Sequence, residues 1–133
     1  MKPLSRRTLL RHLATGVGVG ATGLGLFSLG GCSRIDTARL SAELVALVTD
    51  RPAVSAIGNA YLEKEPRATL EMLAQRLAAE LDWREAMAPD ELAAHLLARI
   101  KRDFEEGRTI RVKGWVLSQT EVRWAALVAL SIA

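Results

Sequence analysis

The sequence has few of the residues that most often carry chemistry. Its 133 residues include one cysteine, Cys32, and two histidines. One thiol cannot form an intramolecular disulfide, and the chain has neither a C-x-x-C pair nor a C-x-x-C-H haem-attachment motif. The G-x-S-x-G turn of serine hydrolases and the lysine-bearing P-loop are also missing from the sequence. We therefore expect no cofactor and no metal site.

The chain also lacks a charge excess once its first residues are set aside. As a whole it has 18 basic and 15 acidic side chains, a formal charge of +3. Four basic residues and no acidic ones precede Cys32, so 14 basic and 15 acidic residues remain, a charge of −1. Nucleic-acid binding needs Lys and Arg clustered on one face, whereas these remaining charges are interspersed. We expect no nucleic-acid partner.

The apolar run from Leu13 to Gly31 contains a G-x-G-x-x-G spacing at Gly18, Gly20 and Gly23. That spacing binds a dinucleotide only when it follows a strand, so that its amides meet the pyrophosphate at a helix N-terminus. Here it follows the basic stretch MKPLSRRTLLRHLAT, which has no β-branched run. A charge-free apolar run behind a basic N-terminus is typical of a secretory signal peptide. An uncleaved N-terminal anchor is the alternative.

The basic stretch contains SRRTLLR, with Arg6 and Arg7 adjacent, and the apolar run ends in LGGC at Cys32. The first motif resembles the twin-arginine (Tat) export consensus, and the second resembles a bacterial lipobox. Together they predict a removed signal peptide at residues 1–31, a lipidated tether at 32–35 and a membrane anchor on Cys32. The Tat translocon and the lipoprotein-processing machinery are then expected partners. The expected location is the cell envelope, facing the periplasm, with the inner and the outer membrane both open.

Residues 36–133 are predicted to form one small, mainly α-helical domain. We expect a bundle of about five helices with one short extended segment or hairpin near residues 109–116. Apolar residues recur at helical spacing in four stretches. The faces expected to be buried are Leu40, Leu44, Leu47 and Val48; then Val54, Ile57, Gly58 and Tyr61; then Leu70, Leu73, Ala74, Leu77 and Leu81; and finally Ala93, Leu96, Leu97, Ile100 and Phe104. Gly58 would let another helix approach closely.

The pattern changes near the end of the chain. RTIRVKGW, residues 108–115, alternates apolar and basic side chains, a period of two that predicts the extended segment. SQTE, residues 118–121, has the spacing of a capping box that opens a helix. The rest of that helix, VRWAALVALSIA, is apolar almost all round, with Arg123 its only charge. Such a helix is normally buried, so we expect it at the centre of the bundle. The alternative is that one of its faces is left for a partner.

No catalytic constellation is evident in these residues. His95 is the only histidine after Cys32, and helical spacing puts it on a solvated face with Arg99, Arg102 and Glu106. Without a second histidine or cysteine, it has no companions for a metal site. Helix capping and solvation explain the acidic residues around a helix junction, which are Asp82, Glu85, Asp90 and Glu91. We expect no enzyme activity, and a small enzyme that uses these carboxylates is the alternative.

The most distinctive stretch is DFEEGRTIRVKGWVLSQTEVRWAAL, residues 103–127. Trp115 and Trp124 either fill the core or, with the strand that carries Val112, contact a partner through Trp115 as an anchor. The stretch resembles the carboxyl-terminal GW-LS-TE-R signature of small Tat-exported bacterial proteins, some of them similar to the small subunits of membrane-bound flavin-dependent sugar and gluconate dehydrogenases. The resemblance implies a lipid-anchored accessory subunit or escort of an exported oxidoreductase, with a large periplasmic oxidoreductase subunit as its partner. A free-standing structural or stress-related envelope lipoprotein is the alternative.

Overall fold

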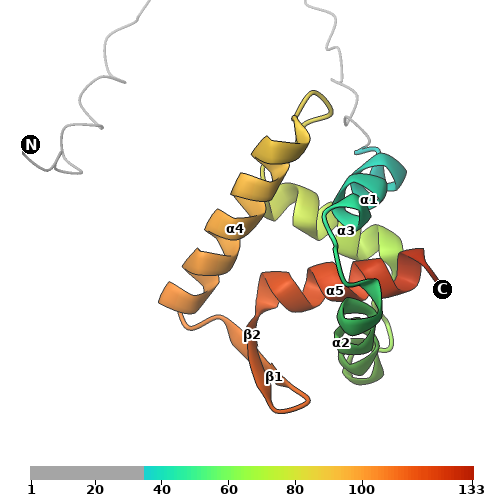
Figure 1. The fold of residues 1–133 in the computed structure, drawn as a ribbon, viewed down its shortest axis with the longest axis vertical. Helices are drawn as coiled ribbons and strands as arrows, with labels where there is room; N and C mark the ends of the chain where they lie inside the picture. Colours follow the sequence, from blue (N-terminus) through green and yellow to red (C-terminus); the bar gives the residue numbers. More distant parts are fainter. Residues whose placement is uncertain (1–34) are drawn as a thin grey trace, which may run out of the picture. The chain divides into compact units, whose positions relative to one another are not determined.

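The computed structural model describes residues 35–133, and the structural statements below concern these residues (Figure 1). They form a mainly helical fold with one β-hairpin, as the sequence predicts. The elements are α1 (Thr37–Ala46), α2 (Arg51–Lys64), α3 (Leu70–Glu80), α4 (Pro89–Glu105), β1 (Thr109–Val112), β2 (Trp115–Ser118) and α5 (Gln119–Ser131). The predicted leader, with Arg6 and Arg7, and the predicted lipidation site Cys32 lie outside the described residues.

Local sequence signals place the helix starts. The side chains of Asp36, Asp50, Thr69 and Ser118 each accept a hydrogen bond from a backbone amide in the first turn of the helix that follows. Such a cap contributes about 1 kcal/mol to helix stability because it satisfies an amide that has no partner within the helix. Helix α4 lacks a side-chain cap and begins with Pro89, whose fixed φ suits a first turn.

Helix α5 lies at the centre of the described fold and contacts each of the other four helices (Figure 1). Its buried residues are Thr120, Val122, Ala125, Ala126, Leu127, Val128 and Ala129. They point in every direction around the helix axis, which is why its sequence is apolar almost all round. The expectation of a buried central helix is confirmed. None of the helices in residues 35–133, α5 included, is long and apolar enough to cross a membrane.

Helix α2 crosses α5 at Gly58. A Cβ atom on Gly58 would lie 2.6 Å from the carbonyl carbon of Ala125 and 2.9 Å from the backbone nitrogen of Ala126. Ordinary contacts between carbon atoms are about 3.5–4.0 Å. The two backbones therefore touch at a position that only glycine accommodates, as the sequence suggested.

The buried face of α4 differs from the predicted one. Leu96 is buried as expected, but Leu97 and Phe104 are exposed, and Leu92 and Asp103 are buried instead. An aspartate is expected to face outward from a helix because a buried carboxylate is costly unless it is paired. In the folded chain α5 donates hydrogen bonds to Asp103, so this acid can occupy the inner stripe of α4.

The hairpin joins α4 to α5. Its strands are antiparallel, with Val112 opposite Trp115, and the two-residue loop consists of Lys113 and Gly114. Both loop residues have positive φ, 49° and 81°, which is the requirement of a type I′ turn. The inner face of the hairpin packs against α2 and α5 through a small buried cluster formed by Ala60, Val112 and Val122.

Candidate functional site

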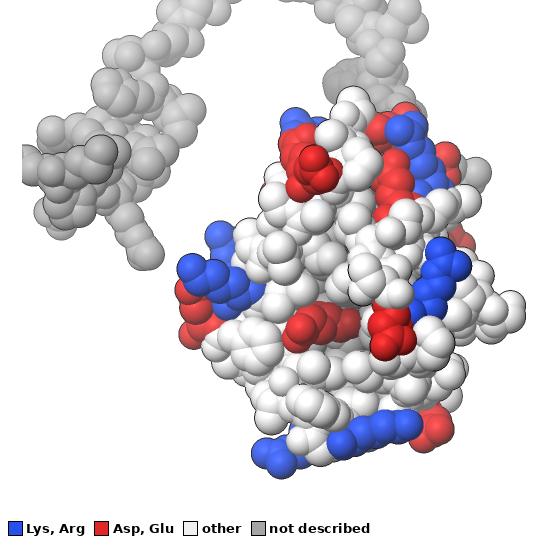
Figure 2. Space-filling model, viewed as in Figure 1, with Lys and Arg blue, Asp and Glu red and all other residues white. Residues whose placement is uncertain are grey.

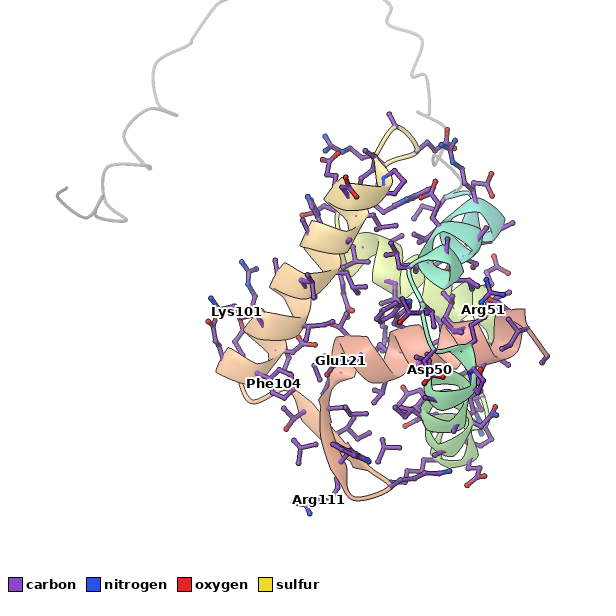
Figure 3. All side chains as sticks on the ribbon, viewed as in Figure 1. Asp50, Arg51, Lys101, Phe104, Arg111 and Glu121 are labelled. Atoms are coloured by element: carbon purple, nitrogen blue, oxygen red, sulfur yellow. The ribbon has the colours of Figure 1, made fainter. Side chains whose placement is uncertain are left out.

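Four large apolar side chains on α4 and β2 are exposed to solvent. Leu97 is 67% exposed and Phe104 47%, while Trp115 is 69% exposed and Val116 48%. Figure 3 shows Phe104 at the end of α4 from which the hairpin continues. Single apolar residues on a surface need no explanation, but Trp115 and Val116 are consecutive residues of one strand and both are exposed. We therefore treat the hairpin and the adjoining end of α4 as the candidate functional site.

The hairpin register explains why Trp115 is exposed. Side chains alternate along a strand, so Trp115 lies on the same face as Val112 and Leu117. Val112 is buried against α2 and α5, and Leu117 is partly buried there. Trp115, however, belongs to β2, whereas the strand that packs against α2 is β1. Its ring therefore lies in solvent, and Val116 points to the opposite face of the hairpin.

The exposed end of the hairpin is basic. Arg111 and Lys113 are exposed, and neither forms an ion pair with another residue of the part of the chain described. Lys64 Nζ donates to the carbonyl oxygen of Arg111 at 3.2 Å, and the chain has no acidic residue between Glu106 and Glu121. Figure 2 shows a row of basic atoms there with one acidic group at its edge, below an uncharged surface. The term hairpin surface is used below for four side chains: Arg111, Lys113, Trp115 and Val116.

The structure does not bring the three predicted partner-binding residues together. Trp115 is open to solvent, whereas Val112 is 1% exposed within the hairpin cluster. Trp124 is partly buried against the main core, and its Nε1 donates to the carbonyl oxygen of Leu44 at 3.0 Å. Val112 and Trp124 therefore hold the domain together, and Trp115 is the one of the three whose side chain a partner can reach.

Asp103 joins α4, the hairpin and α5. Its side chain is 1% exposed. Its Oδ2 accepts hydrogen bonds from the Thr120 hydroxyl at 2.6 Å and the Thr120 amide at 2.9 Å. Its Oδ1 lies 3.1 Å from Arg108 Nε and 3.4 Å from Arg99 Nε. Asp103 was not among the predicted site residues, although its place on the stripe of Leu92 and Leu96 was a signal that could have identified it.

The surroundings of Asp103 keep it ionised. Burial raises the pKa of its carboxyl group. The hydrogen bonds from Thr120 and the charges of Arg99 and Arg108 together lower the pKa by more than burial raises it, so the pKa lies below the ordinary value of 3.8. The ionised carboxylate fixes the end of α4 against the start of α5. Because the hairpin connects these two ends, Asp103 is the residue that positions the hairpin.

The start of α5 has no free amide for an anion. Its first three backbone amides donate to the Arg108 carbonyl oxygen at 3.1 Å, to Asp103 Oδ2 at 2.9 Å and to Ser118 Oγ at 2.9 Å. Glu121 completes the predicted capping box by accepting from the Ser118 amide at 2.7 Å. These bonds make α5 a rigid support for β2.

His95 lies beside a shallow cleft of about 270 Å³ between α3 and α4. Its Nδ1 lies 2.7 Å from the Leu81 carbonyl oxygen, and since a carbonyl only accepts, Nδ1 carries the proton. His95 was expected on a solvated face of its helix, but its side chain is half-buried. The charged residues lining the cleft are Glu80, Asp82, Arg99 and Arg102.

Two of these cleft residues have other partners. Glu80 Oε1 pairs with Arg123 Nη1 at 2.6 Å, and Arg99 pairs with Asp103. No hydrogen bond joins His95 to a carboxylate within residues 35–133, and no metal-binding group of His, Cys, Asp and Glu occurs there. Beyond the cleft, Glu91 pairs with Arg84 at 3.0 Å.

Comparison with protein-family models, with curated proteins and with solved structures gave no significant match. What the chain does is therefore inferred from its own motifs and surfaces.

Proposed function

We propose that the mature chain is a lipid-anchored periplasmic accessory subunit, or escort, of an exported oxidoreductase, with no chemistry of its own. The observation that carries the proposal is the hairpin surface: Trp115 and Val116 are exposed at the basic end of the hairpin, and the buried core is complete without them. Leu97 and Phe104 are two further exposed apolar side chains, on α4. Exposed aromatic anchors with charged neighbours are typical of protein–protein contacts.

The leader motifs support the location and the escort role. A twin-arginine leader serves proteins that cross the membrane folded, and such cargo often carries a cofactor inserted in the cytoplasm. This chain has a leader that resembles that class at Arg6 and Arg7, but it has no cofactor motif. A leader that also carries a larger, leaderless partner would explain this combination. Two or more acyl chains on Cys32 would then anchor the domain stably, since each buried methylene contributes about 0.8 kcal/mol.

A free-standing structural or stress-related envelope lipoprotein is the second candidate. It is favoured by the position of α5, whose apolar side chains are buried within its own domain. A domain that encloses its most apolar helix needs no partner in order to fold.

The export test separates the two candidates. The change is Arg6→Lys with Arg7→Lys, and the readouts are the location of this chain and of periplasmic dye-linked oxidoreductase activity. An escort should keep both in the cytoplasm. The matched control is Arg11→Lys, which changes a third leader arginine and should leave export intact. If the variant chain stays in the cytoplasm while the oxidoreductase is exported normally, the escort role is contradicted and the free-standing lipoprotein is favoured.

The subunit test is isolation of the mature protein from native membranes in mild detergent. The accessory role predicts a large subunit in stoichiometric amount with a flavin or metal absorbance. A colourless, monomeric protein would contradict it.

A further inference from the structure

We propose that the hairpin surface binds an extended, acidic segment of the partner subunit, and that this segment pairs with the outer edge of β2 at Val116. The inference rests on the proposed function and specifies how the accessory subunit recognises its partner. It is carried by the direction of the backbone groups, by the charge of the hairpin and by the position of the predicted membrane tether.

The backbone of β2 is open at Val116. In a hairpin closed by a two-residue loop, the residues that flank the loop bond to each other, here Val112 and Trp115. The next pair, Arg111 and Val116, therefore points its amide and carbonyl groups outward. On the β1 side, Lys64 Nζ already occupies the Arg111 carbonyl. On the β2 side, no hydrogen bond to another element is found for Val116 within residues 35–133.

An added strand would use these free groups. A segment beside β2 would exchange two backbone hydrogen bonds with Val116, the mode by which extended peptides join exposed sheet edges. Ser118, two residues farther along, already donates its amide to Glu121. The added segment can therefore pair with β2 only at the loop end of this strand. Trp115, the residue next to Val116, offers the segment an apolar surface there.

The charge of the surface determines the kind of segment. Arg111 and Lys113 have no ion-pair partner among the described residues. Arg111 is paired with Val116 across the hairpin, so the two side chains share a face, and Lys113 lies in the loop next to that pair. Complementary charge steers association and selects partners. A segment with carboxylates beside its apolar residues would match them, whereas a basic segment would be repelled.

A bilayer fits this surface less well than a protein segment. Inserting the hairpin into lipid would leave the outward amide and carbonyl of Val116 without partners, and each such group costs several kcal/mol in hydrocarbon. The tether also starts elsewhere. The start of α1 contacts the loop before α4, where Arg39 Nη2 donates to the Glu85 carbonyl at 2.6 Å. Figure 1 shows that loop and the hairpin at opposite ends of α4.

The lengths support the same conclusion. Asp36 follows Cys32 by four residues, which span at most about 14 Å. The 17 residues of α4 span about 25 Å. The lipid on Cys32 would therefore hold the α1 end near the membrane, and the hairpin would reach the bilayer only if α4 lay along it.

The first experiment compares variants in the mild-detergent isolation of the complete lipidated protein. Val116→Pro removes the outward amide and fixes the φ angle of residue 116, but it breaks no hydrogen bond of the hairpin ladder. Val116→Ala keeps the amide. Arg111→Glu with Lys113→Glu reverses the charge of the hairpin surface. The matched control is Arg67→Glu with Arg76→Glu, which reverses two exposed arginines beside a separate groove of α2 and α3. Melting curves of each variant establish that it is folded.

The expected result is loss of partner by about tenfold or more for Val116→Pro and for the Arg111 and Lys113 reversal, a change equivalent to about 1.4 kcal/mol. Val116→Ala and the control reversal should retain it. Suppose that the wild type carries the large subunit and that the folded charge-reversal variant carries it as well. The inference is then overturned, while the accessory role stands. If the wild type carries no large subunit, the accessory role itself fails, and the inference fails with it.

A second experiment identifies the contact directly. Lipidation consumes Cys32, so Val116→Cys provides a single free thiol for a photoactivatable benzophenone maleimide. On the isolated complex, the cross-linked peptide should be an acidic, extended segment of the large subunit. Met72→Cys, an exposed position on α3, should not produce that cross-link. Attachment to a basic or helical segment would overturn the inference.

The membrane alternative is tested with vesicles of phosphatidylethanolamine and phosphatidylglycerol that carry brominated acyl chains. The difference in emission between lipidated wild type and Trp115→Phe isolates the Trp115 fluorescence. No quenching by the bromine atoms is expected. Strong quenching would show that the hairpin enters the bilayer and would overturn the inference.

Discussion

Gly58→Ala adds one methyl group where α2 crosses α5. The new Cβ would lie 2.6 Å from the Ala125 carbonyl carbon and 2.9 Å from the Ala126 nitrogen, about an ångström closer than ordinary contact. Both contacted atoms belong to the backbone of the central helix, so no side-chain rotation can relieve the clash. The two helices must move apart, and this disturbs the buried residues around them.

The expected cost follows from two opposing effects. Overpacking a core typically costs 1–3 kcal/mol, and the upper end applies here because the obstacle is backbone. Alanine favours an α-helix over glycine by about 1 kcal/mol, which offsets part of that cost. We expect Gly58→Ala to lower the free energy of unfolding by about 2 kcal/mol. For a domain of about 100 residues that corresponds to a fall in Tm of roughly 10 °C.

The assay is urea unfolding followed by far-ultraviolet circular dichroism, on the mature chain with Cys32→Ser to avoid lipidation. Asn59→Ala is the matched control, because Asn59 is the next residue of α2 and is exposed. That variant should change stability by less than about 0.5 kcal/mol. If Gly58→Ala proves as stable as Asn59→Ala, α2 and α5 do not cross as closely as described and the reasoning is refuted.

Three further predictions concern single side chains. Asp103→Asn should cost about 1.5–3 kcal/mol at pH 7, because hydrogen bonds to a charged group are lost. The pKa of Asp103 is lowered in the folded state, so its stabilisation is present above the ordinary carboxyl pKa and disappears as the pH falls through the folded value. Acid unfolding should accordingly show the wild type losing its advantage over the variant below about pH 4. Trp115→Ala should change the free energy of unfolding by less than about 0.5 kcal/mol, whereas Trp124→Ala should lower it by about 3 kcal/mol. Both values are measured by denaturant titration. Equal effects of the two substitutions would contradict the exposed position of Trp115 and the buried position of Trp124. Cys32→Ala should abolish fatty-acid labelling and leave a longer, membrane-bound precursor, whereas unchanged labelling would exclude the lipoprotein assignment.

Signals between close neighbours along the chain were readable before the fold was known. Asp36 and Ser118 accept from amides three residues ahead, and the Ser118–Glu121 capping box forms as its spacing indicates. The stripe of α3 and the apolar character of α5 also predicted burial correctly. Caps and stripes depend on helical geometry alone, which is why local sequence is enough to find them.

Contacts between distant residues were not readable in this way. The orientation of α4 was predicted wrongly at Leu97 and Phe104, because the pattern counted apolar residues and could not count a satisfied carboxylate. Asp103 finds Thr120 seventeen positions later, and Trp124 finds the Leu44 carbonyl eighty positions earlier. Nothing in the neighbouring sequence of either residue specifies its partner.

The sequence by itself determined where the last helix begins, that this helix would be central and that a short extended segment precedes it, because these follow from capping, periodicity and chain hydropathy. Only the tertiary structure decided which tryptophan is open to solvent, which face of α4 is buried and which strand edge is free. Those properties depend on how α2, α4 and α5 pack around the hairpin, and packing is set by complementarity between residues that are distant in the chain.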